Sequence, residues 1–255
     1  MKNNLIGKTV LITGASSGIG SSCALYLAKM GVNLILCARR KEILQDIKKE
    51  LAIHNVDITI LQIDVSKKDE VEEKLSKILK TINIDILINS AGLALGLEEF
   101  DKADLDDWDN MIDTNIKGLL YVSHKIIPQM REKNSGHIIN LGSIAGVMTY
   151  PKGNVYCATK HSVHSISEAM NVDLADTNIR VSNIAPGAVE TEFSNVRFKG
   201  DDNKADSVYK GFIPLTPDDI ADMIVYVLNV PAHINIQNTL IMPTAQRNAY
   251  ITNRG

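Results

Sequence analysis

Short runs of apolar residues alternate along the chain with longer stretches in which apolar residues recur every three or four positions. The short runs are rich in Val, Ile and Leu and are typical of buried strands, whereas the longer periodicity is typical of amphipathic helices. We expect strands at Thr9–Thr13, Asn33–Cys37, Asp57–Ile63, Asp85–Asn89, His137–Leu141, Ile179–Ala185 and Asn238–Met242. We expect helices at Ile19–Met30, Lys41–His54, Lys68–Thr81, Leu105–Glu132, Asn154–Ala175 and Pro217–Asn229.

This alternation predicts the fold class. Strands that alternate with helices across short connections form right-handed crossovers, so the pattern predicts a doubly wound, parallel, seven-stranded α/β sheet with helices on both faces. The sequence contains no flexible linker or repeat, so we expect one domain over residues 1–255, with a cofactor half at about 1–142 and a catalytic and substrate half at about 143–255. The polar, weakly periodic segment at about 190–213 follows the sixth strand, and we interpret it as a mobile lid because irregular segments of this length are commonly functional.

The overall charge excludes several classes of partner. The chain has 255 residues with 27 basic and 30 acidic side chains and a formal net charge of -3, which offers no electrostatic footprint for nucleic acid or for a membrane surface. No apolar run approaches the ~20 residues of a membrane span, and we expect no cleavable signal before the first strand. The three cysteines lack metal-ligand spacing and are typical of a reducing compartment. We therefore expect a cytoplasmic protein without a metal site.

The first predicted strand ends in a glycine-rich turn, Thr13-Gly-Ala-Ser-Ser-Gly-Ile-Gly20, which opens the first helix. Glycines let the backbone turn sharply and approach a pyrophosphate, and a helix N-terminus offers unpaired N–H groups and a partial positive charge. The spacing Gly-x-x-x-Gly-x-Gly differs from the standard dinucleotide fingerprint but lies in the strand–turn–helix context of a Rossmann fold. We predict cofactor contacts from Gly14, Ser16, Ser17, Gly18 and Ile19.

Residues at the ends of the next strands indicate which dinucleotide is bound. Arg39 and Arg40 follow the second strand, where a protein that binds NAD usually has an acidic residue for the ribose hydroxyls. Two guanidinium groups attract a 2′-phosphate, so this position favours NADP. Asp64 ends the third strand, where its carboxylate can accept a hydrogen bond from the adenine amino group, cap the following helix, or do both. Further predicted cofactor contacts at the same edge are Val65, Asn89, Ala91 and Gly92.

The spacing of Ser143, Tyr156 and Lys160 points to catalysis. Tyr156 and Lys160 are four positions apart in a predicted helix, so their side chains project from one face. A neighbouring ammonium favours the phenolate, and we expect it to lower the tyrosine pKa from its usual value of ~10. Ser143 follows the fifth strand, at the edge that faces the same pocket. A Tyr-x-x-x-Lys pair alone is typical of many surface helices, but together with the serine and the glycine-rich turn it predicts an enzyme.

These residues together resemble the short-chain dehydrogenase/reductase family over essentially the whole chain. Its motifs have counterparts in Thr13–Gly20, Asn89–Gly92, Asn115, the Ser143, Tyr156 and Lys160 set, and Pro186-Gly187 with Thr191. The resemblance implies that Tyr156 transfers a proton and that Ser143 stabilises the substrate oxygen. It also implies that Lys160 binds the nicotinamide ribose, and that Asn115 holds a water between this lysine and solvent. Ser90 departs from the family pattern, which usually has a second Asn, so we expect this support to be modestly looser. Further implied cofactor contacts are Pro186, Gly187, Val189, Thr191 and Phe193.

A narrower resemblance is to the NADP-dependent 3-hydroxy acid dehydrogenases. It is carried by Ala91–Gly96, Met111–Asn115, Gly153–Tyr156, Thr191–Asp202 and Pro231–Ile236. Thr191–Asp202 is the most specific of these because it lies in the segment that varies most between activities in the wider family. The resemblance implies hydride transfer between NADP(H) and a short 3-hydroxy acid such as serine or 3-hydroxypropionate, and it implies a homotetramer.

Two alternatives remain open on the sequence. The chain could reduce bulkier ketones or acyl-carrier 3-ketoacyl thioesters, which would favour an apolar lid, whereas small acids need a cation. It could also be an NADPH-sensing or scaffold protein, although such a protein would be expected to lose Tyr156 or Lys160. The lid contains the cations Arg197 and Lys199. We predict that Arg197 binds the substrate together with Ser143 and Tyr156, the alternative being a solvated loop charge.

Overall fold

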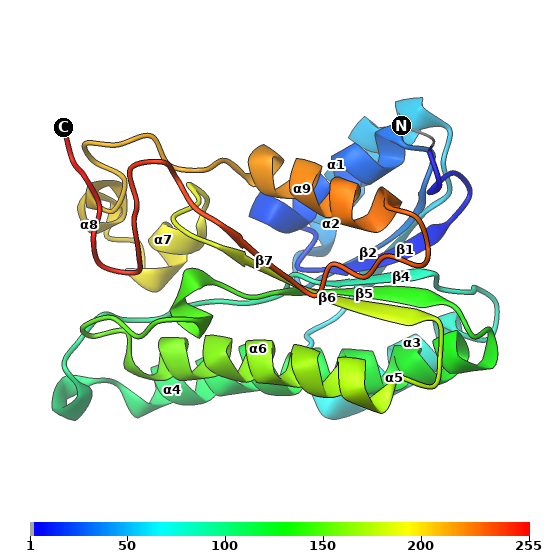
Figure 1. Ribbon diagram of the computed structural model, residues 1–255, viewed down its shortest axis with the longest axis horizontal. Coiled ribbons are helices and arrows are strands. Elements are labelled where there is room, and N and C mark those ends of the chain that lie inside the picture. Colours follow the sequence, from blue (N-terminus) through cyan, green and yellow to red (C-terminus); the bar gives the residue numbers. More distant parts are fainter. Residues whose placement is uncertain (1–2) are drawn as a thin grey trace.

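The computed structural model describes residues 3–255. Seven strands form one parallel sheet, and they are β1 (Thr9–Thr13), β2 (Asn33–Ala38), β3 (Ile58–Gln62), β4 (Ile86–Asn89), β5 (Gly136–Leu141), β6 (Ile179–Pro186) and β7 (Asn238–Ile241). Their order in the sheet is β3-β2-β1-β4-β5-β6-β7, so the chain starts in the middle and winds outward in both directions (Figure 1). The winding reverses between β1 and β4, which is where open α/β sheets bind ligands.

Helices cover both faces of the sheet (Figure 1). One face packs against α1 (Gly18–Lys29), α2 (Lys41–Leu51) and α9 (Pro217–Asn229). The other packs against α3 (Lys68–Ile78), α5 (Leu119–Glu132) and α6 (Asn154–Asp173). Because successive strand residues point to opposite faces, Leu34 and Leu36 pack in the first layer whereas Ile35 packs in the second. Each fully buried Leu or Ile contributes about 1.5–3 kcal/mol to the stability of these layers. The fold class predicted from the sequence is confirmed.

The helix expected over Leu105–Glu132 is interrupted in its middle, at the segment that contains Asn115. The structure instead has α4 (Leu105–Ile112), a π-helical segment Asp113–Gly118 and then α5. A π-helical turn takes in one extra residue and re-aims the side chains around it. The turn contains Asn115, whose side chain is hydrogen-bonded to Leu93 and Thr159 on neighbouring elements. The interruption therefore lies where a side chain connects this helix to the site.

The segment expected to be an irregular lid contains two short helices, α7 (Phe193–Arg197) and α8 (Asp202–Ser207). Helices of five and six residues are too short for an apolar period to appear in the sequence. The second helix starts at a local signal, because the Asp201 carboxylate accepts from the Lys204 N–H at 3.1 Å. The mobility of this lid stays a prediction.

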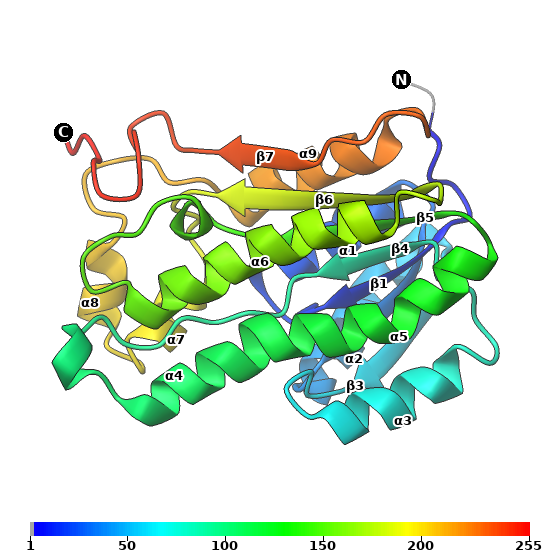
Figure 2. The same ribbon diagram turned by 60° about the horizontal axis from the view of Figure 1, so that its bottom comes forward.

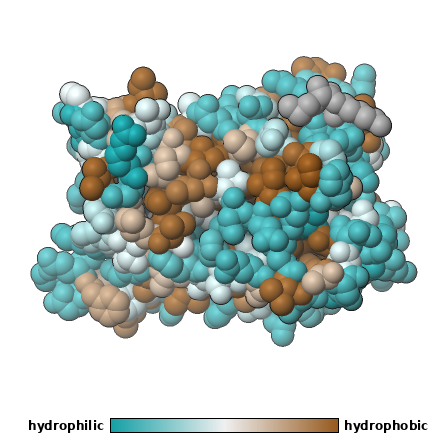
Figure 3. All heavy atoms as spheres, in the orientation of Figure 1, coloured by the Kyte–Doolittle hydropathy of each residue, from teal (hydrophilic) through white to brown (hydrophobic). Residues whose placement is uncertain are grey.

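The lid lies beyond the end of the sheet at which β6 and β7 finish (Figures 1 and 2). The edge strand β7 contains Leu240, a residue that is 51% exposed. On the face of the molecule that Figure 3 shows, apolar side chains gather near the middle. No helix within residues 3–255 combines the length and the apolar character that crossing a membrane requires.

Candidate active site

A cavity of about 760 Å³ opens at the carboxyl edge of the sheet, between the glycine-rich turn and the lid. Its wall contains nearly all of the predicted site residues, contributed by segments far apart in the sequence. Those residues are Gly14, Ser16, Ser17, Gly18, Ile19, Arg39, Arg40, Asp64, Val65, Ala91, Gly92, Ser143, Tyr156, Lys160, Pro186, Gly187, Val189, Thr191, Phe193 and Arg197. Asn89 and Asn115 are not part of the wall. Among residues 3–255, no cluster of His, Cys, Asp and Glu is arranged to hold a metal ion.

The backbone of the glycine-rich turn requires glycine at two of its positions, Gly14 and Gly18. Gly14 and Gly18 have φ values of 67° and 52°, and a Cβ on Gly14 would lie 2.9 Å from the backbone of Ala91. The turn leads into α1, whose N-cap residue Ser17 makes no side-chain capping bond. The first N–H groups of the helix therefore remain available to an anion in the cavity.

The Thr13 hydroxyl connects this turn to the end of β4. It accepts hydrogen bonds from the backbone N–H groups of Ser90 and Ala91 at 3.1 and 3.0 Å. The same hydroxyl donates to the Ile88 carbonyl. The contacts at Ser90 use its backbone, so the position keeps these bonds although its side chain differs from the family pattern.

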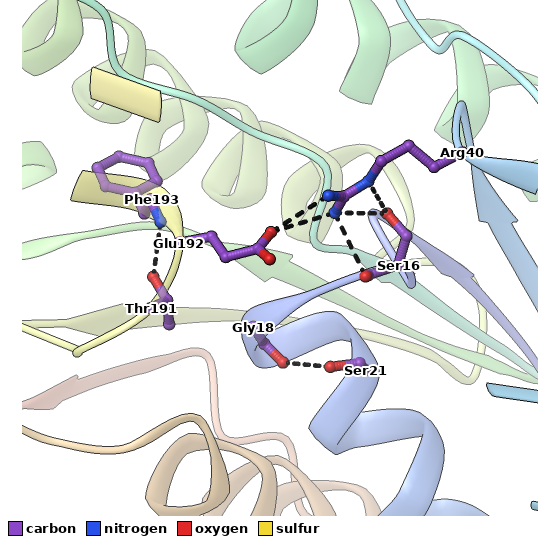
Figure 4. Close-up of polar contacts among 7 residues, drawn as sticks. All are labelled: Ser16, Gly18, Ser21, Arg40, Thr191, Glu192 and Phe193. Carbon is purple, nitrogen blue, oxygen red and sulfur yellow. Dashed lines mark hydrogen bonds and ion pairs between the residues drawn. The ribbon is translucent and has the colours of Figure 1, made fainter. Parts of the chain in front are cut away.

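Arg40 follows β2 and lies between two loops of the cavity (Figure 4). Its guanidinium donates to the Ser16 hydroxyl and carbonyl in the glycine-rich turn, and to the Glu192 carboxylate at the start of the lid. Arg39 is exposed beside it and also lines the cavity. Two guanidinium groups at the end of β2 provide the charge and the donors that a phosphate needs.

Asp64 lies at the cavity wall after β3, but it does not cap the following helix. Its Oδ1 accepts from the Ser66 backbone N–H at 3.0 Å and from the Ser66 hydroxyl at 2.8 Å, which closes a turn. Helix α3 starts only at Lys68, and its N-cap Lys67 makes no side-chain bond. Asp64 therefore shapes the loop before α3.

Tyr156 and Lys160 lie on one face of α6, as their spacing predicts, and both are buried, with 8% and 7% of their surfaces exposed. Ser143 follows β5, and its hydroxyl accepts from the Ala145 N–H at 3.1 Å. Burial raises the pKa of Tyr156 above its ordinary value, and the tyrosine at position 150 raises it further, while hydrogen bonding to Ser143 and the charge of Arg197 oppose the rise. At neutral pH the phenol is therefore protonated.

The structure contradicts the expectation that Lys160 lowers the pKa of Tyr156. Its ammonium donates to the Leu141 carbonyl at 2.7 Å, and burial lowers the lysine pKa to about 8. It lines the cavity close to Gly92, where an added Cβ would be only 3.6 Å from the lysine Nζ and 3.2 Å from the Asn115 side chain. The cation that lowers the Tyr156 pKa in this structure is instead Arg197.

Asn115 supports the wall from behind. Its carboxamide accepts from the Leu93 N–H at 2.8 Å and donates to the Leu93 carbonyl at 2.8 Å. It also donates to the Thr159 hydroxyl, next to Lys160 on α6, at 3.1 Å. The π-helical segment thus fixes the loop after β4 relative to the catalytic helix.

Asn89 is also committed to the interior. Its side-chain N–H groups donate to the Ser123 hydroxyl and to the Asn140 carboxamide, both at 2.9 Å. These bonds connect β4 with α5 and β5, below the cavity. In this structure its side chain supports the strand end and does not reach the cavity wall.

Arg197, the last residue of α7, is not a solvated loop charge. Its Nε donates to the Gly96 carbonyl at 3.1 Å, and its Nη1 donates to the Tyr150 hydroxyl at 3.0 Å. The guanidinium carbon lies 5.6 Å from the centre of the Tyr156 ring. The other lid cation, Lys199, is instead paired with Asp107 at 2.9 Å, so it holds the lid to α4.

Tyr150 is a site residue that the sequence analysis missed. It lines the cavity between Arg197 and α6, and burial raises the pKa of its hydroxyl while Arg197 lowers it. It lies in an irregular segment before the helix, where no periodicity marks it. The only available signal was an aromatic residue six positions before Tyr156. Phe193 adds a second aromatic wall, with its ring centre 5.7 Å from that of Tyr156.

The chain is similar to known proteins over nearly its whole length. A family model described as short chain dehydrogenase matches residues 8–202. The NADP-dependent 3-hydroxy acid dehydrogenase YdfG of Escherichia coli K12 is 46% identical over 239 residues, which are 93% of this chain and 95% of that protein. The NADP-dependent 3-hydroxy acid dehydrogenase of Schizosaccharomyces pombe is 44% identical over 250 residues, 97% of this chain and 96% of that one. The solved closed form of a serine dehydrogenase complexed with NADP+ is 44% identical, with a TM-score of 0.90 over 97% of this chain and 99% of the other.

Proposed function

The chain belongs to the short-chain dehydrogenase family, and from this premise we propose that it transfers a hydride between NADP(H) and the 3-hydroxyl carbon of a short hydroxy acid such as serine or 3-hydroxypropionate. One observation carries the proposal. Ser143, Tyr156 and Lys160 face one cavity in which a guanidinium, that of Arg197, lies against the ring of the tyrosine. A proton carrier and a carboxylate-binding cation are therefore neighbours, which a small hydroxy acid requires.

The residues of the cavity fit an NADP molecule. The glycine-rich turn lines the cavity at the start of α1, where a pyrophosphate can approach the first N–H groups of the helix. Arg39 and Arg40 supply cations for the 2′-phosphate, and the loop that contains Pro186, Gly187, Val189, Thr191 and Phe193 forms the opposite wall. When bound, the nicotinamide ring accepts or supplies the hydride.

The chain's own residues then handle the proton and the charge. Tyr156 Oη, protonated at neutral pH because burial raises its pKa, donates its proton to a carbonyl oxygen during reduction and takes it back during oxidation. Ser143 orients that oxygen and stabilises its developing charge. Lys160 provides a buried ammonium for the ribose hydroxyls. One of its three N–H groups donates to the Leu141 carbonyl, so the ammonium can hydrogen-bond a ligand as well. Asn115 is a positioning residue for this lysine and for the loop at Leu93.

Substrate recognition is assigned to the lid. A short hydroxy acid buries little apolar surface, so its affinity must come from charge-assisted hydrogen bonds to the carboxylate. The guanidinium of Arg197 has five N–H donors, of which Gly96 and Tyr150 use two, so further donors remain for the substrate. The Tyr150 hydroxyl, which accepts from this guanidinium, lies beside it and can donate to the same carboxylate.

Assembly, domain division and location are further parts of the proposal. We propose a homotetramer, which the half-exposed Leu240 on the edge strand β7 supports because an exposed apolar sheet edge favours pairing with another chain. We propose one domain, with the cofactor half at about 1–142 and the catalytic half at about 143–255. Three free, buried cysteines support a cytoplasmic location.

A substrate panel tests the proposal. Purified protein would be assayed with NADP+ and serine, 3-hydroxypropionate, related 3-hydroxy acids, sugar alcohols and neutral secondary alcohols, with NADPH absorbance as the readout. The matching ketones and a 3-ketoacyl thioester would be assayed with NADPH. The proposal predicts the highest kcat/KM for a short 3-hydroxy acid. A clear preference for bulky ketones or thioesters would contradict it.

A further inference from the structure

The cation proposed for the 2′-phosphate already has an anionic partner within the chain. Arg40 Nη1 and Nη2 both donate to Oε2 of Glu192 at 3.3 Å, while Nε donates to the Ser16 hydroxyl, also at 3.3 Å (Figure 4). Glu192 is 152 positions away in the sequence and is the N-cap residue of α7. One guanidinium therefore bridges the glycine-rich turn and the N-cap residue of α7.

The geometry of this ion pair makes it replaceable. Its side chains are 46% and 63% exposed, and both contacts reach a single carboxylate oxygen at the long end of the hydrogen-bond range. Solvent-exposed ion pairs of this kind contribute little to stability, because water screens their attraction and two long side chains must be held in place. A ligand with more charge and more acceptor oxygens can therefore displace the carboxylate.

We propose that Glu192 competes with the cofactor's 2′-phosphate for Arg40, so that the phosphate must displace the side chain of this lid residue in order to bind. The inference rests on the NADP cofactor of the proposed function and names a residue that sets its affinity. A phosphate carries between one and two negative charges at neutral pH and three acceptor oxygens, against one charge on Glu192. The two anions repel each other at one guanidinium, so Glu192 moves away when the phosphate binds.

The displacement is transmitted to the reacting tyrosine through two short connections. Thr191, directly before Glu192, packs closely against the glycine-rich turn, where a Cβ on Gly18 would lie 3.3 Å from its methyl carbon. Thr191 also accepts from the Phe193 N–H at 3.1 Å (Figure 4). Phe193 and Arg197, on the helix that follows, both lie against the Tyr156 ring. Binding of the cofactor's phosphate would therefore shift the lid segment that contains Phe193 and Arg197 and lines the substrate site.

Binding of nucleotide fragments isolates this competition from catalysis. Isothermal titration calorimetry would compare adenosine 2′,5′-bisphosphate with 5′-AMP, which lacks the 2′-phosphate. Glu192→Gln keeps the shape of the side chain and removes its charge. We expect it to bind the bisphosphate about fivefold more tightly, as removal of one like charge from a hydrated site gives, and to bind 5′-AMP within twofold of the unmodified protein.

Two matched variants locate the effect. Glu190→Gln removes the same charge two residues away on the lid, outside the cavity wall, and should change neither affinity by more than twofold. In an Arg40→Ala background, Glu192→Gln should no longer favour the bisphosphate. Hydrogen exchange of the amides of residues 193–198 should change with the bisphosphate and not with 5′-AMP, and the change should disappear in Glu192→Gln.

The outcomes separate this inference from the proposed function. Unmodified protein that binds the bisphosphate no more tightly than 5′-AMP would overturn both the NADP cofactor and the competition. Three results would overturn the role of Glu192 alone. One is a preference for the bisphosphate that Glu192→Gln leaves unchanged, and another is an equal increase of that preference in Glu190→Gln. The third is an equal effect of Glu192→Gln in the Arg40→Ala background.

Discussion

Arg197→Met would remove a cation from the cavity wall and leave a flexible apolar side chain in its place. The change deletes the hydrogen bonds from Arg197 to the Gly96 carbonyl and the Tyr150 hydroxyl, as well as the charge 5.6 Å from the Tyr156 ring centre. It therefore affects the lid contact, the substrate carboxylate and the protonation of the tyrosine, and each effect has its own measurable consequence.

The largest expected effect is on acidic substrates. A hydrogen bond to a charged partner contributes about 1.5–3 kcal/mol, so loss of the guanidinium should lower kcat/KM for a short 3-hydroxy acid by about 10- to 100-fold. A neutral secondary alcohol makes no such bond, and its kcat/KM should change by less than about threefold. Because Arg197 lowers the pKa of Tyr156, its removal raises that pKa further, and the pH profile of oxidation should move to higher pH.

Steady-state kinetics with both substrate classes, over a range of pH, would measure these effects, and thermal unfolding would verify that the variant is folded. Lys199→Met is the matched control, since it removes another lid cation that pairs with Asp107 and Asp104 outside the cavity wall. It should leave the ratio of acid to alcohol activity unchanged. Equal losses on acidic and neutral substrates in Arg197→Met, or no loss on either, would refute the reasoning.

Three other changes test the remaining parts of the site. Tyr156→Phe keeps the ring but removes the proton carrier, so kcat should fall by about 10²–10⁴-fold in a folded protein that still binds NADPH by fluorescence titration, and near-normal turnover would contradict the mechanism. Arg39→Ala combined with Arg40→Ala should raise the KM for NADP by about 100-fold and spare that for NAD; equal use of both cofactors by the unmodified protein would sink this assignment. Burial lowers the folded-state pKa of Lys160 to about 8 from 10.5, so the unfolded chain holds more protons in this window. The free energy of unfolding should therefore rise by about 3 kcal/mol as the pH increases from 8 to 10.5, and urea titrations should show this rise to be absent in Lys160→Met.

The sheet could be predicted from the sequence because parallel strands are buried on both faces and so appear as short, nearly continuous apolar runs. All seven predicted strands are present, with boundaries that differ by at most one residue. Helices begin at the predicted residues Lys41, Lys68, Asn154 and Pro217. The residues that follow strands were also predictable, because all parallel strands end at one edge. This places Gly14, Arg40 and Ser143 on one cavity although they are far apart in the chain.

What the sequence could not predict depends on contacts between distant segments. Asn115 belongs to a π-helical turn whose partners, Leu93 and Thr159, are 22 and 44 positions away. Arg197 could be assigned to the lid, but its contacts with Gly96 and Tyr150 depend on how a five-residue helix docks. The pKa of Tyr156 was predicted to fall because spacing shows a neighbouring lysine, whereas burial, which spacing does not show, raises it.

The central claim, hydride transfer from the hydroxyl carbon of a short 3-hydroxy acid to NADP, is tested most directly by isotope transfer. Protein would be incubated with NADP+ and 3-hydroxypropionate deuterated at the carbon that bears the hydroxyl, and the reduced cofactor would be analysed by mass spectrometry. The account predicts NADPH that carries one deuterium, and no label when Tyr156→Phe replaces the unmodified protein. Unlabelled NADPH, or label that appears only when NAD+ replaces NADP+, would contradict it.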